Sequence, residues 1–76
     1  MDTYKTKDIF EAAYIYSQGI TLSTLEPDKH YFWFIFQNKE KCEELSQSYW
    51  QQKATGNIKL FVNSLKTLKD LVFSKD

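Results

Sequence analysis

One stretch of aromatic sequence decides the fold of this chain, and it reads His30-Tyr31-Phe32-Trp33-Phe34-Ile35-Phe36-Gln37. Aromatic and β-branched side chains without glycine or proline are typical of a β-strand. Successive side chains of a strand point to opposite sides of the sheet. One face therefore carries Phe32, Phe34 and Phe36, and the other carries Tyr31, Trp33 and Ile35. The phenylalanine face is expected to be core, and the second face needs a cover or a partner because a solvated sheet face is normally polar.

The segment before this strand predicts its pairing partner. Residues Ile20 to Glu26 alternate loosely and contain two threonines, which favours a strand. Pro27-Asp28 suits the centre of a tight turn, because proline fixes φ and aspartate bonds nearby backbone groups. The two strands are therefore expected to form an antiparallel hairpin.

A helix is predicted from Asp8 to Gln18. Asp8 and Glu11 have the spacing of a capping box, and Gly19 is placed to end the helix in a left-handed conformation. Helical periodicity puts four residues along one stripe, with Ile9, Ala12 and Tyr16 beside it: Phe10, Ala13, Tyr14 and Ser17. The paired alanines Ala12 and Ala13 allow close approach to a sheet or a second helix.

Two more helices are predicted after the hairpin. Asn38 can cap a helix from Lys39 to Lys53, and a further helix extends through Ile58 to Ser74. One side of the last helix carries apolar residues in helical register, backed by Leu71: Phe61, Leu65, Leu68 and Val72. The start of the last segment is ambiguous, and a short third strand near residues 57–60 stays open. The expected architecture is one α+β domain over residues 1–76, with the two C-terminal helices packed on one sheet face.

Size and composition limit what this domain can be. The chain has 76 residues, of which 17% are aromatic, and a domain this small must bury nearly all its large apolar side chains or find a partner. The single cysteine excludes an internal disulfide framework and suits a reducing compartment. No secretory signal and no membrane-spanning apolar run is recognised, so we expect a cytoplasmic protein without a membrane partner.

The residue inventory argues against an enzyme. His30 is the only histidine, so no paired histidines are available for a metal site or a His–carboxylate network. Cys42 falls on the apolar side of its helix and has no second cysteine nearby. The two glycines are isolated, which excludes a phosphate-binding glycine loop. We expect no catalytic residues, no metal, no cofactor and no small-molecule substrate.

Charge is balanced overall but unevenly distributed. Residues 1–52 carry five lysines and eight acidic residues, whereas residues 53–76 carry five lysines and two acidic residues. No arginine is present, which weakens bidentate reading of phosphates or bases. Four lysines of the C-terminal part are candidates for a basic strip: Lys53, Lys59, Lys66 and Lys69. A solvated helix face explains the same lysines more simply.

Three explanations compete for the face formed by Tyr31, Trp33 and Ile35. A helix or terminal segment covers it, two copies of the chain meet through it, or it stacks nucleic-acid bases as single-strand-binding sheets do. The main expectation is a non-catalytic interaction module that acts as a homodimer, a homo-oligomer or a binder of a protein partner. The alternative is nucleic-acid binding, with Tyr31 and Trp33 stacking on bases and the lysine strip meeting phosphates.

The sequence also resembles a family of small bacterial and phage proteins of unknown function. The resemblance starts at Thr6-Lys7-Asp8-Ile9, and it continues through Ala12-Ala13-Tyr14, Gly19, the alternating Phe32, Phe34 and Phe36, and then Phe61, Leu65, Leu68 and Lys69. It implies a phage or mobile-element setting. It carries no established activity and no functional residues.

Overall fold

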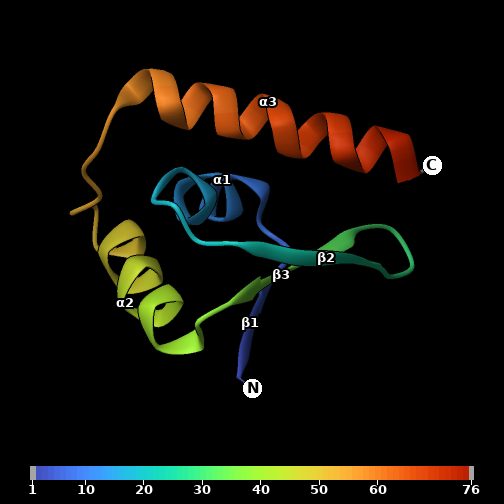
Figure 1. Ribbon diagram of the computed structural model, residues 1–76, viewed down its shortest axis with the longest axis horizontal. Coiled ribbons are helices and arrows are strands. Elements are labelled where there is room, and N and C mark those ends of the chain that lie inside the picture. Colours follow the sequence, from blue (N-terminus) through green and yellow to red (C-terminus); the bar gives the residue numbers. More distant parts are fainter. Residues whose placement is uncertain (1, 76) are drawn as a thin grey trace.

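The chain forms three strands and three helices in a computed structural model that describes residues 2–75 (Figure 1). Their order is β1 (Thr3–Thr6), α1 (Ile9–Ser17), β2 (Leu22–Pro27), β3 (Phe32–Gln37), α2 (Lys39–Trp50) and α3 (Ile58–Lys75). The predicted α+β class is confirmed, and the hairpin of β2 and β3 is present and antiparallel.

The sheet has the order β1-β3-β2, so the aromatic strand β3 is its centre. β1 pairs antiparallel with β3, with Tyr4 opposite Phe36 and Thr6 opposite Phe34. The third strand is therefore N-terminal, and the alternative of a strand near 57–60 is wrong. The Asn57 side chain caps α3 there by accepting from the Leu60 backbone N–H at 3.1 Å, which commits this segment to helix.

The aromatic strand is shorter than its aromatic run. The backbone N–H of Asp28 donates to the Tyr31 carbonyl at 2.8 Å, which closes the hairpin turn and leaves His30 and Tyr31 outside the strand. Within the strand the phenylalanine face is core, as predicted. Phe34 and Phe36 are buried, and Phe32 packs against the same core cluster.

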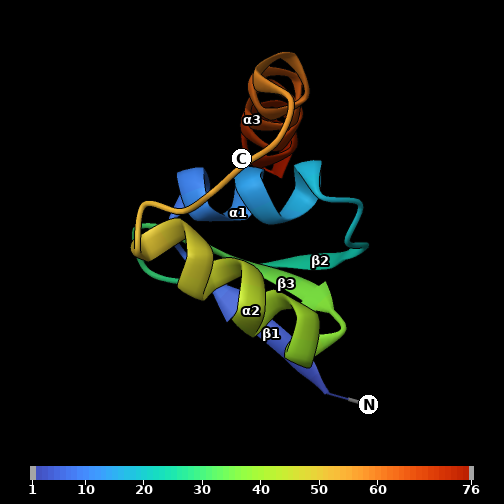
Figure 2. The same ribbon diagram turned by 90° about the vertical axis from the view of Figure 1, so that its left-hand side faces the viewer.

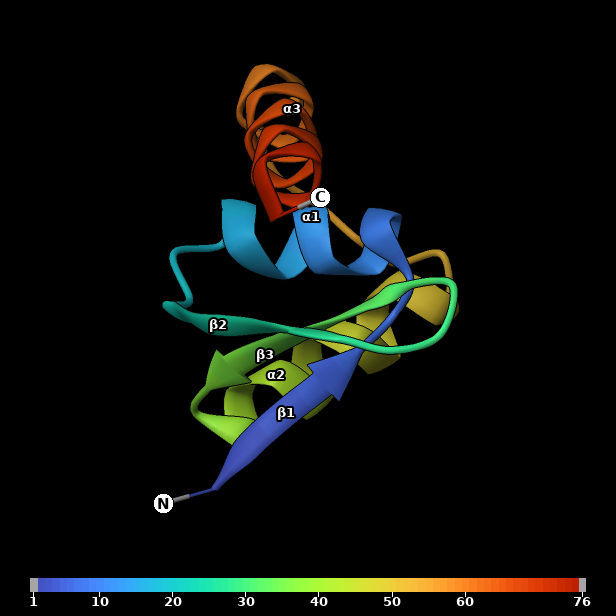
Figure 3. The same ribbon diagram turned by 90° about the vertical axis from the view of Figure 1, so that its right-hand side faces the viewer.

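The helices form two further layers on one side of the sheet. α1 and α2 contribute to the core cluster that contains Phe34 and Phe36. α3 lies across α1 on the side away from the sheet, as Figures 2 and 3 show from opposite directions. The expectation that both C-terminal helices pack on the sheet is correct for α2. It is wrong for α3, whose main packing partner is α1.

α1 is consequently covered on several sides. Five consecutive residues of it are buried, from Glu11 to Ile15. A helix with one wet side does not show this pattern, because consecutive residues are 100° apart around the axis. Ala12 and Ala13 are fully buried and let the neighbouring elements approach closely, as expected, whereas Phe10, on the same stripe as Ala13, is 49% exposed.

The helix ends follow the sequence signals only in part. The Asp8 carboxylate accepts from the backbone N–H groups of Phe10 and Glu11, and Gly19 has φ +91°, as expected. Asn38 accepts from the Lys41 N–H and caps α2. α2 stops at Trp50, before the predicted Lys53, because Gln52 turns left-handed (φ 60°) and the Lys53 N–H closes a Schellman motif on the Ser48 carbonyl.

Glu11 does not complete the predicted capping box. Its carboxyl group is buried and is surrounded by hydroxyl groups of β1 and α2. The Thr6 hydroxyl donates to Oε1 at 2.5 Å, and the Tyr4 hydroxyl donates to Oε2 at 2.8 Å. The Ser46 hydroxyl also donates to Oε2. These bonds replace the water that the carboxyl group loses on burial, and they join β1, α1 and α2.

Glu11→Gln tests this network. The amide keeps the size of the side chain but substitutes a donor for one acceptor oxygen, so a hydroxyl donor loses its partner. We expect the free energy of unfolding to fall by about 1–3 kcal/mol in urea titrations. The exposed Glu44→Gln is the control and should change stability by less than about 0.5 kcal/mol. Equal effects of the two substitutions would contradict a stabilising role for the network.

Candidate interaction surfaces

The sheet face opposite the helices is uncovered by any described element; we call it the open sheet face (Figures 1 and 3). Its residues follow from the strand register, which sets Lys5 opposite Ile35 and Glu26 opposite Trp33. No helix and no terminal segment within residues 2–75 lies on it. The explanation in which a further layer of this chain covers the second aromatic face is thus wrong for the described residues.

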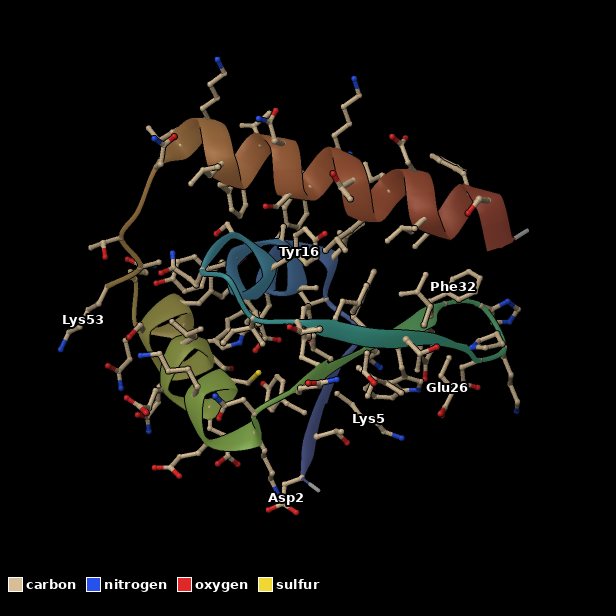
Figure 4. The ribbon with its side chains drawn as sticks, in the orientation of Figure 1. Asp2, Lys5, Tyr16, Glu26, Phe32 and Lys53 are labelled. Carbon is tan, nitrogen blue, oxygen red and sulfur yellow. The ribbon has the colours of Figure 1, made fainter. Side chains whose placement is uncertain are left out.

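Long polar side chains cover part of the open sheet face instead. Figure 4 shows Lys5 and Glu26 on the side of the sheet away from α1. Lys5 Nζ lies 3.7 Å from the Glu26 carboxylate, so this ion pair joins the two edge strands across β3. Lys5 Nζ is also 5.6 Å from the centroid of the Trp33 ring, which is within cation–π range. Ile35, beside Lys5, keeps only 9% of its surface exposed.

The two remaining aromatic residues form a pair at the hairpin end. The rings of Tyr31 and Trp33 meet edge to face, with centroids 5.8 Å apart. Lys7 Nζ lies 4.7 Å from the Tyr31 ring centroid. The Trp33 indole N–H donates to Asp28 at 3.1 Å. Hydrogen bonds from the Lys29 backbone N–H and then from Trp33 lower the pKa of the Asp28 carboxyl group.

The structure therefore divides the predicted surface residues. Tyr31 is 37% exposed, Trp33 is half-buried, and Ile35 is nearly covered. Sequence reasoning missed Lys5 and Lys7, which sit over these rings. The signal that would have found them is the period-two alternation of Thr3-Tyr4-Lys5-Thr6-Lys7, which puts the lysines on the outer face of an added strand.

The four lysines of the basic strip do not meet the aromatic pair. Lys53 projects from the segment after α2, as Figure 4 shows. Lys59, Lys66 and Lys69 are exposed on α3, which α1 separates from the sheet. The structure thus places the predicted stacking residues and the predicted phosphate-binding residues on different sides of the molecule.

α3 carries the two most exposed of the large hydrophobic side chains in the described part of the chain. Phe61, Leu65, Leu68 and Val72 face the core as predicted. Ile58 is 80% exposed and Phe73 is 72% exposed, and three more apolar residues of α3 are also exposed: Leu60, Val62 and Leu71. Sequence reasoning missed this surface because it assigned only the inward stripe and the lysines of the helix.

A third surface lies between α2 and β1; we call it the acidic groove. It is open, has a volume of about 780 Å³, and is lined by Tyr4, Glu40, Glu43, Glu44, Ser46, Gln47, Trp50 and Gln51. Its apolar part is Trp50, which is 60% exposed and meets the Tyr49 ring edge to face at 5.0 Å. Glutamates in the first turns of a helix complement the helix dipole, and no groove was predicted from the sequence.

The groups best suited to chemistry are held in structural contacts. Cys42 is fully buried, and its thiol donates to the Gln37 carbonyl at 3.3 Å. Burial raises the pKa of this thiol, and the charges of Glu11 and Glu43 add to the rise. Burial likewise raises the pKa of the Tyr4 phenol. Within residues 2–75, no three side chains of histidine, cysteine, aspartate or glutamate gather where they could hold a metal ion.

The fold and these surfaces define a small α+β domain with helices on one face of a three-stranded sheet. The model of the family described as Domain of unknown function (DUF5659) matches residues 1–74, and the chain belongs to this family. The resemblance to a family of unknown function is confirmed, while the phage or mobile-element setting stays a prediction. No curated protein and no solved structure matches the chain. Among the described helices, none is long and apolar enough to cross a membrane.

The environment of Cys42 predicts an unreactive thiol. A thiol reacts as the thiolate, and both burial and a raised pKa oppose that form. We expect iodoacetamide to label Cys42 on the order of 100-fold more slowly in the native protein than in urea, because labelling requires opening of the fold. Mass spectrometry measures both rates. Labelling at similar rates would show that α2 does not hold Cys42 in the core.

Proposed function

We propose that this chain is a non-catalytic interaction domain that binds a second copy of itself or another protein. The observation that carries the proposal is the apolar surface of α3. This helix has 18 residues, yet among residues 58–74 only Ser64 and Leu68 expose less than a tenth of their surface. Clustered exposed apolar side chains are a feature of binding surfaces, and an amphipathic helix face commonly docks in a partner's groove.

The small size of the domain supports this proposal. Burying a large apolar side chain stabilises a protein by about 1.5–3 kcal/mol, and a domain of this length has little stability to spare. Leaving Ile58 and Phe73 mostly in water therefore forgoes a substantial contribution. Association recovers it by covering both side chains.

Tyr31 and Trp33 belong to the proposal as a second contact. Both rings are partly accessible, and aromatic residues are enriched in the centres of interfaces. Ile35 contributes little because its neighbours already cover it. A reducing compartment such as the cytoplasm suits the single, free cysteine.

Paired substitutions distinguish the two contacts. Val62→Ser with Phe73→Ser alters the α3 surface, and Tyr31→Ser with Trp33→Ala alters the open sheet face. We expect the wild-type chain to gain mass with concentration in sedimentation equilibrium, and the α3 variant to stay monomeric with an unchanged circular dichroism spectrum. The sheet variant should weaken self-association less than the α3 variant does. A wild-type chain that is monomeric throughout would exclude self-association and leave only a different protein as partner.

Nucleic-acid binding is the second candidate, and one observation favours it. Lys5 and Lys7 stand beside Trp33 and Tyr31, so cations and stacking rings occur together on the open sheet face. In this form of the nucleic-acid proposal, Lys5 and Lys7 contact the phosphates in place of the four lysines of the basic strip. Glu26 and Asp28 oppose it, because they place negative charge at the same rings.

Tryptophan fluorescence tests this candidate. If the open sheet face stacks on bases, single-stranded oligonucleotides quench Trp33 at low salt and the effect weakens steeply as salt rises. Lys5→Glu with Lys7→Glu should abolish the quenching, whereas Lys66→Glu with Lys69→Glu should leave it unchanged. The variant Trp50→Phe removes the other tryptophan so that the signal reports Trp33 alone. No quenching at low salt would exclude this function.

A further inference from the structure

We propose that one flank of α3 docks in the acidic groove of a second copy of this chain. The inference rests on the proposed interaction function and names its partner. The flank consists of Ile58, Val62, Lys66, Lys69 and Phe73. At about 100° per residue these five positions fall within an arc of roughly 80° on α3, so apolar and basic side chains share one stripe. We call this stripe the basic flank.

The two surfaces carry opposite charges that find no partners within one copy. Lys66 and Lys69 are exposed on the basic flank, and Glu40, Glu43 and Glu44 are exposed in the groove. Among the side chains of residues 2–74, the ion pair of Lys5 and Glu26 is the only one with a nitrogen–oxygen distance below 4 Å. The charges of both surfaces are therefore free to pair with another molecule.

The spacing of the groups matches when the two helices run antiparallel. Lys66 and Lys69 are three residues apart, as are Glu40 and Glu43, which gives about 4.5 Å along each axis. Pairing Lys69 with Glu40 and Lys66 with Glu43 leaves Ile58 about 12 Å beyond Lys66. On the groove side, Trp50 lies about 10.5 Å beyond Glu43. The same alignment thus joins both charge pairs and brings the exposed Ile58 to the exposed Trp50.

Trp50 is suited to be the apolar anchor of this contact. Its ring is 60% exposed but is held edge to face by Tyr49, so binding costs little side-chain entropy. Tryptophan is also among the residues that most often dominate interface energies. The flanking glutamates then fix the direction in which α3 lies, because charge complementarity sets register more than affinity.

A second copy is the occupant that the charge distribution favours. Residues 1–52 hold the excess of acidic residues, and residues 53–76 hold the excess of lysines, while the whole chain is neutral. Two copies therefore have no net repulsion, and each offers both a basic flank and an acidic groove. Within one copy, α3 packs mainly on α1, and the two helices α2 and α3 are not major packing partners. The complementary surfaces are thus left for contact between copies.

A charge exchange between two variants tests the inference. One variant carries Lys66→Glu and Lys69→Glu, and the other carries Glu40→Lys and Glu43→Lys. Each variant alone opposes like charges and should associate at least about tenfold more weakly than the wild-type chain in sedimentation equilibrium. An equimolar mixture restores opposite charges at the contact and should associate like the wild type. The wild-type association should weaken as salt rises.

The control variant carries Lys29→Glu and Lys41→Glu, which change the net charge as the α3 variant does but lie outside both surfaces. It should associate far better than the α3 variant. Any weakening relative to the wild type should be no larger than the change of net charge alone produces. Circular dichroism and urea midpoints confirm that all variants fold.

The outcomes separate this inference from the function on which it rests. Recovery of association in the mixture, and not in either variant alone, supports docking of α3 in the groove. A wild type that associates while the mixture stays monomeric overturns the docking inference, yet leaves an interaction domain that uses another surface. A wild type that is monomeric at every concentration overturns the inference and self-association together.

Discussion

The burial of α1 from several sides is the constraint on which the rest of the structure depends. The sheet lies under this helix, α2 lies beside it, and α3 lies across it. A helix in this position has no wet side at its middle, so Ala12 and Ala13 are packed tightly and Glu11 is taken out of water. The carboxyl group of Glu11 must then be satisfied internally. Hydroxyl groups of Tyr4, Thr6 and Ser46 do so, and they fasten β1 and α2 to α1.

This layering also decides where the molecule exposes apolar surface. Because α1 occupies the centre, α3 contacts the domain through one stripe and leaves both flanks in water. All helices lie on one side of the sheet, so the other side is covered only by side chains such as Lys5. The acidic groove is also on the outside of the domain, because it is formed by the side of α2 that carries exposed glutamates. The molecule therefore has three accessible surfaces, and the apolar one on α3 is the most exposed.

Much of the local structure could be predicted from the sequence. The aromatic strand, the hairpin, the capping roles of Asp8 and Asn38, and the turn at Gly19 follow from short-range physical preferences. β1 could not be predicted with the same ease, because a four-residue polar strand is defined by the register it makes with β3. The end of α2 was also misplaced, since a left-handed Gln52 is a weaker signal than a glycine.

The candidate surfaces show the same division. By itself, the sequence determined that one face of the aromatic strand is core, that chemistry-bearing groups are few, and that acidic and basic residues are segregated along the chain. Only the tertiary structure decided that Lys5 and Lys7 lie over the aromatic rings of the other face, that the lysines of α3 lie away from it, and that α3 carries exposed apolar flanks. The physical reason is the distance along the chain over which each effect acts. Periodicity and capping act over a few residues, whereas exposure depends on how layers distant in sequence stack.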